Sequence, residues 1–266
     1  FSDPRARQDL EQAGVRCETV NLAVGDFSSL PTDFDYVINL AVAKSGRWDK
    51  DLAANAESVG LLMAHCRDAK AFLHASSAAV YDPPDDEPRT ETTALGDNHK
   101  HLFPTYSISK IAGETVARTM ARVLGLPTVI ARLNVPYGDN GGWQFYQMEM
   151  MLAGVPIPVP PGGPARYNPI HEEDILATLP GLLDAASVPA TTVNWCGDQA
   201  VSIQEWCSYI GELVGREPVF AEDAHALRGG PTDPSRLHEL VGGTSVDWRD
   251  GIRRMVTKFH PELVGR

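Results

Sequence analysis

The chain has 266 residues, of which 43% are hydrophobic, enough for one sizeable core or for one domain with a small lobe. Its net charge of -12 argues against non-specific binding to nucleic acid, although a locally basic pocket for one anionic ligand is compatible with it. The four cysteines lack the paired spacing of a disulfide framework or a zinc site, and no apolar run is long enough to span a membrane. We therefore expect a cytoplasmic protein without a signal peptide, a membrane segment or a nucleic-acid partner.

In the first half of the chain, helical patterns alternate with short apolar runs. The run at 36–40 is apolar throughout, which is typical of a parallel strand buried on both faces. The run at 71–75 is similar and ends in two small polar residues, Ser76 and Ser77. In chain order, the expected elements are a helix at 6–13, strands at 15–22 and 36–40, a helix at 52–66 and a strand at 71–75.

The second half begins with a long polar and acidic segment at 82–104, and a loop of this length in a compact domain is usually functional or disordered. The alternation of strands and helices then resumes, which predicts an α/β fold with a doubly wound parallel sheet and helices on both faces. The expected elements are a helix at 107–124, a strand at 128–133, helices at 144–152 and 172–185, a strand at 192–195 and a mainly helical tail from Ser202.

The composition changes after residue 133, where proline, glycine and aromatic residues become dense. We interpret this stretch as an irregular lobe that interrupts the parallel-sheet domain. The expected division is a nucleotide-binding domain at 1–133 and 168–200 and a smaller substrate-binding lobe at 134–167 and 201–266.

The most informative local pattern is Tyr106-Ser-Ile-Ser-Lys110. Residues four apart on a helix project from the same face, so the lysine ammonium would lie near the phenol. A nearby cation favours the phenolate and lowers the pKa of a tyrosine, which prepares it for proton transfer to or from an alcohol oxygen. The same spacing also occurs by chance as an exposed helical pair.

A second pattern lies upstream, where the strand at 71–75 runs into Ser77. A hydroxyl at the carboxyl end of a parallel strand lies where open α/β sheets bind their ligands. Ser77 could therefore hold a reacting oxygen against Tyr106. Taken alone, Ser77 is equally compatible with a helix-capping or turn serine.

In this order, the motifs resemble the extended short-chain dehydrogenase/reductase family, which holds nucleotide-sugar epimerases and dehydratases on a Rossmann-like fold. The similarity extends over most of the chain. The matching segments are Gly25-Asp26-Phe27, Asn39 to Lys44, Asn55, Ser76-Ser77 to Tyr81, Tyr106 to Lys110, Arg132 to Gly138, Pro169 to Ile175, and Val193 to Asp198 with Ser202 to Glu205.

This resemblance implies an enzyme that uses NAD or NADP and a small-molecule substrate, and a homodimer is compatible with it. Tyr106 would be the general acid/base, Lys110 would lower its pKa and bind the nicotinamide ribose, and Ser77 would orient the substrate oxygen. Asn134 is the candidate for the substrate-contacting asparagine, although the family places that residue further from the arginine at 132. The implied cofactor contacts are Asp26, Leu40, Ala41, Val42, Lys44, Asn55, Tyr106 and Lys110.

The sequence lacks the Gly-rich turn with which the family holds the cofactor pyrophosphate at a helix N-terminus. We expect the biological polypeptide to extend upstream by a strand, this turn, a helix and a second strand, because the run at 36–40 otherwise has an open edge. Strands from another chain, or the tail after Ser202, are alternative ways to cover that edge.

Three further alternatives concern the chemistry. Ser77 is followed by two alanines instead of the Asp-Glu pair of dehydratases, so dehydration is disfavoured while epimerisation and alcohol/ketone chemistry stay open. A non-catalytic dinucleotide sensor, or a truncated inactive relative, is the rival to an enzyme. His99 and His101 could suggest a metal site, but no third ligand of clear spacing accompanies them, and we expect none.

Overall fold

The computed structural model describes residues 4–82 and 87–263 and is built around one parallel sheet. Its strand order is β1-β2-β3-β9, and every neighbouring pair runs parallel. This confirms the predicted α/β class with a Rossmann-like parallel sheet. The strands are β1 (Tyr36–Asn39), β2 (Ala71–Ser77), β3 (Thr128–Leu133) and β9 (Thr191–Trp195).

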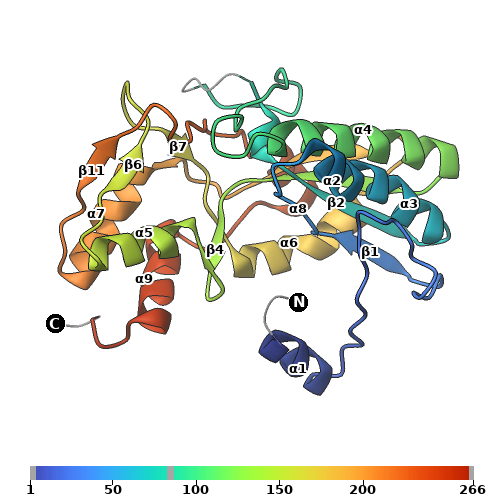
Figure 1. Cartoon of the computed structure of the whole chain (residues 1–266), viewed down its shortest axis with the longest axis horizontal. Helices are drawn as coiled ribbons and strands as arrows, with labels where there is room; N and C mark the ends of the chain where they lie inside the picture. Colours follow the sequence, from blue (N-terminus) through green and yellow to red (C-terminus); the bar gives the residue numbers. More distant parts are fainter. Residues whose placement is uncertain (1–3, 83–86, 264–266) are drawn as a thin grey trace.

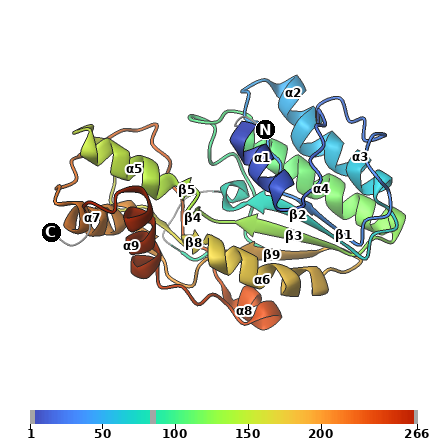
Figure 2. The ribbon, with the colours of Figure 1, turned by 90° about the horizontal axis from the view of Figure 1, so that it is seen from below.

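Helices cover both faces of this sheet (Figures 1 and 2). On one face, α3 and α4 bury a cluster around Phe72 and Ile130, and on the other, α6 and α8 bury one around Leu73 and Trp195. None of the helices in the described ranges is long and apolar enough to cross a bilayer. The helices are α2 (Trp48–Leu52), α3 (Ser58–His65), α4 (Tyr106–Leu124), α6 (Glu172–Asp184) and α8 (Ser235–Val241).

The helix α4 is the longest of these elements, and its ends follow from its sequence. It begins at Tyr106 and ends at Leu124, and the capping residue Gly125 has a φ of 66°, a left-handed conformation that glycine adopts without strain. Pro127 follows two residues later, and a proline there prevents the helix from continuing. The predicted helix at 107–124 therefore forms as expected.

Two predictions about the first 40 residues are wrong. Residues 15–22 form no strand, because no described strand lies beside them to complete the hydrogen bonds. The helix α1 (Pro4–Gln12) instead stands away from the main body in Figure 1. Strand β1 is not buried on both faces, since Tyr36 is 48% exposed and Ile38 is 40% exposed. It is the edge strand of the described sheet, and its free edge is the one where further strands were expected.

The remaining elements form a smaller lobe (Figure 1). Its core contains the fully buried Trp206 and Ile157, packed with residues of the three helices named below. The elements are helices α5 (Trp143–Leu152), α7 (Ile203–Val214) and α9 (Trp248–Phe259), parallel strands β6 (Ile157–Val159) and β11 (Phe220–Glu222), and antiparallel strands β7 (Arg166–Tyr167) and β10 (Val201–Ser202).

A short three-stranded sheet lies where the chain passes between the two parts. It consists of β5 (Gly141–Gly142), β4 (Pro136–Gly138) and β8 (Ile170–His171). The expected division assigned all of 201–266 to the lobe, but α8 lies against the main sheet, where Leu237 is fully buried. The tail therefore contributes helices to both parts of the molecule.

Candidate functional site

The strand β2 ends at the carboxyl edge of the sheet with Ser77. Its Oγ accepts a hydrogen bond from the backbone N–H of Ala79 at 3.2 Å, which caps the short 3-10 helix Ala78–Val80. The phenol of Tyr106 lies near enough to the same hydroxyl for Ser77 to favour its phenolate form. The capping interpretation and the functional one are thus both compatible with its position.

Lys110 lies one turn after Tyr106 on α4, and its side chain is almost completely buried, with 3% of the residue exposed. Its Nζ donates a hydrogen bond to the backbone carbonyl of Ala75, two residues before Ser77, at 2.7 Å. An ammonium group has three protons, and no other partner of Lys110 is found among the described residues. The structure therefore brings Ser77, Tyr106 and Lys110 together where β2 ends and α4 begins.

The pKa of Tyr106 shifts in the direction opposite to the one expected from the sequence. Burial raises the pKa of Tyr106, and the hydrogen bond from Ser77 offsets this only in part. The pKa of Lys110 is lowered to about 8 by burial and by the charge of Lys44, with the carboxylate of Glu114 acting in the opposite direction. The expected lowering of the Tyr106 pKa is therefore wrong for this state, because desolvation of the phenol dominates.

The segment after β1 passes beside this set. The Nζ of Lys44 lies 4.6 Å from the ring centroid of Tyr106 and 5.0 Å from that of Phe103, without an ion pair to any described residue. Such cation–π contacts hold an ammonium near aromatic faces. Leu40 and Val42 leave their side chains exposed at the same strand end, and Ala41 donates its N–H to Asn39 Oδ1 at 3.3 Å.

Asn55 fixes that segment against α4. Its Oδ1 accepts from the backbone N–H of Ala43 at 2.7 Å, and its Nδ2 donates to the Ala43 carbonyl at 2.8 Å and to Ser109 Oγ at 3.0 Å. The amide of this buried residue is thus occupied by the chain itself. Its contribution is to hold residues 40–44 in place.

Two other candidates have partners that do not require a ligand. Asp26 is exposed and accepts from the backbone N–H of Ser28 at 2.9 Å, as an ordinary turn aspartate does. Asn134 is buried, and its Nδ2 donates to Thr232 Oγ1 at 3.1 Å. The structure therefore does not bring Asp26 or the amide of Asn134 into contact with the Ser77–Tyr106–Lys110 set.

His99 was considered only as a metal ligand, but its ring lies 5.7 Å from the ring of Tyr106. Burial and the charge of Lys44 lower its pKa to about 4, so the imidazole is neutral at physiological pH. Within 4–82 and 87–263, no group of three His, Cys, Asp or Glu side chains is arranged to hold a metal ion. Sequence spacing could not reveal His99, because the loop conformation decides which residue meets Tyr106.

The segment at 82–104 is more firmly attached than its composition suggests. Residues 83–86 lie outside the described part of the chain, but Arg89 is 3% exposed and exchanges backbone hydrogen bonds with 231 and 233. Its carbonyl also accepts from Asn194 Nδ2 at 2.8 Å. The part of this segment around Arg89 is therefore anchored in the core, although its polar composition alone would suggest few core contacts.

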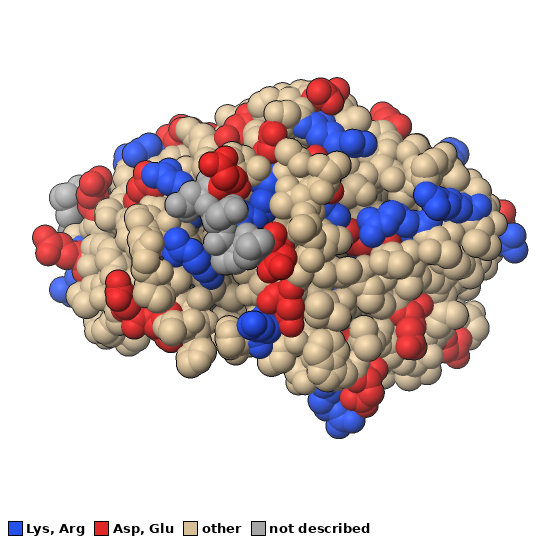
Figure 3. All heavy atoms as spheres, turned by 90° about the horizontal axis from the view of Figure 1, so that it is seen from above, with Lys and Arg blue, Asp and Glu red and all other residues tan. Residues whose placement is uncertain are grey.

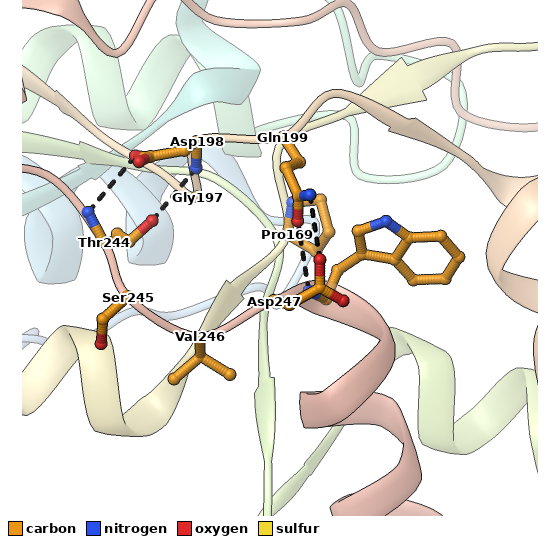
Figure 4. A pocket seen from close by; sticks show the side chains of 9 residues that line it. Pro169, Gly197, Asp198, Gln199, Thr244, Ser245, Val246 and Asp247 are labelled. Carbon is orange, nitrogen blue, oxygen red and sulfur yellow. Dashed lines mark hydrogen bonds between the residues drawn. The ribbon is translucent and has the colours of Figure 1, made fainter.

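A cavity of about 260 Å³ lies elsewhere, between the loop after β9 and the start of α9 (Figure 4). Its polar groups are already paired: Asp198 Oδ1 accepts from Thr244 N–H and lies 2.8 Å from His238 Nε2, and Asp247 Oδ2 accepts from Gln199 Nε2 at 3.0 Å. None of the Ser77–Tyr106–Lys110 set lines this cavity. These polar groups therefore do not need a ligand to complete their hydrogen bonds.

The net negative charge does not leave the molecule uniformly acidic. Figure 3 shows acidic and basic side chains mixed over one face, with a row of basic ones toward the right end, where α4 and its neighbours lie. Helix α4 contributes Arg118, which is paired with Glu114, and Arg122 in its last turn. A locally basic site for an anionic ligand, as the sequence allowed, is compatible with this distribution.

The fold recurs in solved structures of sugar-nucleotide enzymes. A variant of UDP-glucuronic acid 4-epimerase from Bacillus cereus, solved with a fluorinated UDP-glucuronic acid and NAD, has a TM-score of 0.81 at 19% identity over 96% of this chain and 85% of that one. Thermus thermophilus UDP-glucose 4-epimerase with NAD has a TM-score of 0.72 at 20% identity over 95% and 94% of the two chains. At these identities the similarity shows the fold.

Two curated relatives are similar in sequence. A Bacillus subtilis protein described as an uncharacterized UDP-glucose epimerase, YtcB, is 24% identical over 208 residues, which are 74% of this chain and 64% of that protein. The Sinorhizobium fredii protein y4nG is 30% identical over 168 residues, 62% of this chain and 39% of that protein. The chain thus spans less than two thirds of the length of each.

The family itself is identified by a sequence model described as the NAD dependent epimerase/dehydratase family, which matches residues 4–187. This range includes the parallel sheet up to β3, the helix α4 and the whole Ser77–Tyr106–Lys110 set. Because the match covers more than half of its 266 residues, the chain belongs to the NAD dependent epimerase/dehydratase family.

Proposed function

We propose that the protein is an NAD-dependent epimerase or oxidoreductase that acts at an alcohol or carbonyl carbon of a nucleotide sugar, with Tyr106 as the acid/base. The observation that carries this proposal is that Tyr106 lies near Ser77, while the buried ammonium of Lys110, one helical turn later, is bonded to the Ala75 carbonyl of the same strand end. The solved structures with the same fold, which hold NAD and UDP-sugars, support the choice of cofactor and substrate class.

The residues present fit the nicotinamide–ribose end of NAD. Lys110 uses one of its three protons on Ala75, and the remaining two suit the ribose hydroxyls as acceptors. The exposed side chains of Leu40 and Val42 offer apolar surface at the end of β1. The Gly-rich turn that would hold the pyrophosphate does not occur in the described residues, so the fit concerns this end alone.

The roles of the side chains follow from their contacts. Transfer of a hydride from or to the alcohol carbon is the chemistry that nicotinamide supplies when bound. The raised pKa keeps Tyr106 protonated at neutral pH, ready to donate its proton to a carbonyl oxygen. In the reverse direction Tyr106 must first lose its own proton, and its phenolate oxygen then takes the proton of the alcohol. Ser77 holds the reacting oxygen beside Tyr106 by a second hydrogen bond.

Epimerisation or alcohol/ketone interconversion fits the site better than dehydration. Elimination of water needs further acid/base groups beside the reacting carbon. The residues after Ser77 are Ala78 and Ala79 in the 3-10 helix, and neither can move a proton. A non-catalytic dinucleotide sensor is the second candidate, but the presence of both Tyr106 and Lys110 at the end of β2 favours an enzyme.

Substitution of Lys110 tests the cofactor role. In the full-length protein, we expect Lys110→Ala to weaken NADH binding at least about tenfold, because hydrogen bonds from a charged donor contribute about 1.5–3 kcal/mol each. Titration with NADH, followed by nicotinamide fluorescence, measures this change. Lys70→Ala, which removes an exposed lysine paired with Asp35, should bind NADH as the wild type does. Equal affinities in the two variants would contradict the assignment.

Hydrogen exchange tests whether the loop before Tyr106 closes over ligands. The anchored stretch around Arg89 should be protected with and without ligand, because its backbone hydrogen bonds are buried. The stretch at 97–104, which contains His99, should gain protection when NADH and UDP-glucose are added together, as an active-site lid does. Identical exchange of 97–104 in both states would exclude a lid.

A further inference from the structure

A buried ion pair lies directly behind the proposed site. The carboxylate of Glu114, one turn after Lys110 on α4, is completely buried. Arg132 on β3 binds it in bidentate fashion, with Nε to Oε1 at 2.9 Å and Nη2 to Oε2 at 2.8 Å. Oε1 also accepts from Ser76 Oγ at 2.6 Å, and Oε2 accepts from Arg118 at 3.2 Å.

The pair connects four of the segments around the site. Ser76 is the residue before Ser77, and in the parallel register of β2 and β3 it lies opposite Arg132. The Nη1 of Arg132 donates to the Tyr81 hydroxyl at 3.1 Å and to the Glu91 carbonyl at 3.0 Å. One guanidinium thus links α4, β3, the end of β2 and the loop that leads to Tyr106.

Stabilisation of the fold does not by itself explain why a charged pair is buried at this position. Burying two charges costs desolvation energy, and well-packed apolar residues in place of a buried pair are often equally stable or more stable. What apolar residues cannot reproduce is the directional bond to the hydroxyl next to Ser77. A misplacement of about 1 Å in a reacting group can cost on the order of 10²-fold in rate.

We propose that Glu114 and Arg132 are positioning residues, which fix the strand end that carries Ser77 against the helix that carries Tyr106 and Lys110 through the Ser76 hydroxyl. This inference rests on the proposed function. Glu114 has a second effect on the same site, because its charge raises the pKa of Lys110 against the effects of burial and Lys44. The pair therefore sets both the geometry and the charge of the site.

Ser76→Ala tests the geometric part, since it removes one buried hydroxyl and leaves the ion pair. In the full-length protein with UDP-glucose as the probe, we expect kcat to fall about 10- to 100-fold, while NADH affinity and KM change less than about twofold. Ser58→Ala is the matched control, because Ser58 Oγ is also buried and donates a 2.6 Å hydrogen bond, to the carbonyl of Ala54 in the π-helical turn Ala53–Glu57 that precedes α3. Its kcat should equal that of the wild type.

Glu114→Gln tests the electrostatic part. Below a pKa of about 8 the wild-type Lys110 is charged, and loss of the Glu114 charge should move its titration to lower pH. The alkaline limb of kcat should shift in the same direction, and NMR titration of the Lys110 ammonium, assigned by its absence in Lys110→Met, gives a readout independent of turnover. A merely structural role predicts no shift in either titration.

The outcomes separate this inference from the proposed function. If Tyr106→Phe abolishes turnover while Ser76→Ala behaves like Ser58→Ala and Glu114→Gln keeps the wild-type pH profile, the function stands and the positioning role is overturned. If Tyr106→Phe retains wild-type turnover, the proposed function itself is overturned. Loss of kcat in Ser76→Ala together with the shifted Lys110 titration supports the positioning role.

Discussion

Tyr106→Phe should reduce turnover by about 10²–10⁴, the range that general acid–base catalysis contributes. The phenylalanine keeps the ring that contacts Lys44 and His99 and removes only the hydroxyl that meets Ser77. Steady-state rates with UDP-glucose, measured in the full-length protein beside an NADH titration, separate loss of proton transfer from loss of binding. NADH affinity should change little, because the ribose contact is assigned to Lys110.

Tyr146→Phe is the matched control for this experiment. Tyr146 lies on α5 in the lobe and is 66% exposed, so loss of its hydroxyl should leave turnover unchanged. A Tyr106→Phe enzyme with wild-type turnover would remove Tyr106 from the reaction. A variant that loses NADH binding together with turnover would instead mean that the phenol hydroxyl contributes to holding the cofactor.

The central elements of the fold were predictable because their patterns are local. The apolar run of β2, the helical spacing of α4 and the glycine and proline after it each determine a structure within a few residues. The convergence of Ser77 with Tyr106 followed from topology, since the carboxyl ends of parallel strands meet at one edge of a sheet. These parts of the site depend on backbone geometry that a sequence pattern encodes.

Burial at the start of the chain was not predictable in the same way. An apolar run such as that of β1 shows that a strand forms, but neighbouring elements decide how much of it is covered. Here Val37 packs against the α3 and α4 side, whereas Tyr36 and Ile38 are exposed. Residues 15–22 fail as a strand for the same reason, because a strand needs a partner that its own sequence does not specify.

Electrostatic features of the site were the least accessible from sequence. The expected lowering of the Tyr106 pKa assumed that the lysine four residues later would dominate, but the balance between burial and charge depends on packing. The positions of Lys44 and His99 beside Tyr106 come from loops of irregular conformation. The Glu114–Arg132 pair joins residues from two elements, and only the helical spacing of Glu114 from Lys110 could have suggested it.

Arg132→Met should destabilise the protein by about 3–5 kcal/mol, because it leaves the Glu114 carboxylate buried without its main partner. Urea unfolding, followed by circular dichroism, measures this loss as a lower transition midpoint. The exposed pair of Arg254 and Glu173, with a 2.6 Å contact, provides the control, since Arg254→Met should cost only about 0–1 kcal/mol. Equal losses in the two variants would contradict the importance of burial.

The pH dependence of this loss provides a further test of its cause. In the wild type, burial tends to raise the pKa of Glu114, but its hydrogen bonds and the charges of Arg132 and Arg118 bring it below the usual value. That contribution to stability is present above the unfolded-state pKa and is lost as pH falls through the folded one. Without Arg132, burial dominates and the folded pKa rises above the unfolded one, so the variant loses stability as pH increases. We therefore expect the difference in unfolding free energy between the wild type and Arg132→Met to become smaller in acid. A second substitution, Glu114→Leu, removes the unpaired charge. Added to Arg132→Met, it should recover much of the lost stability at neutral pH.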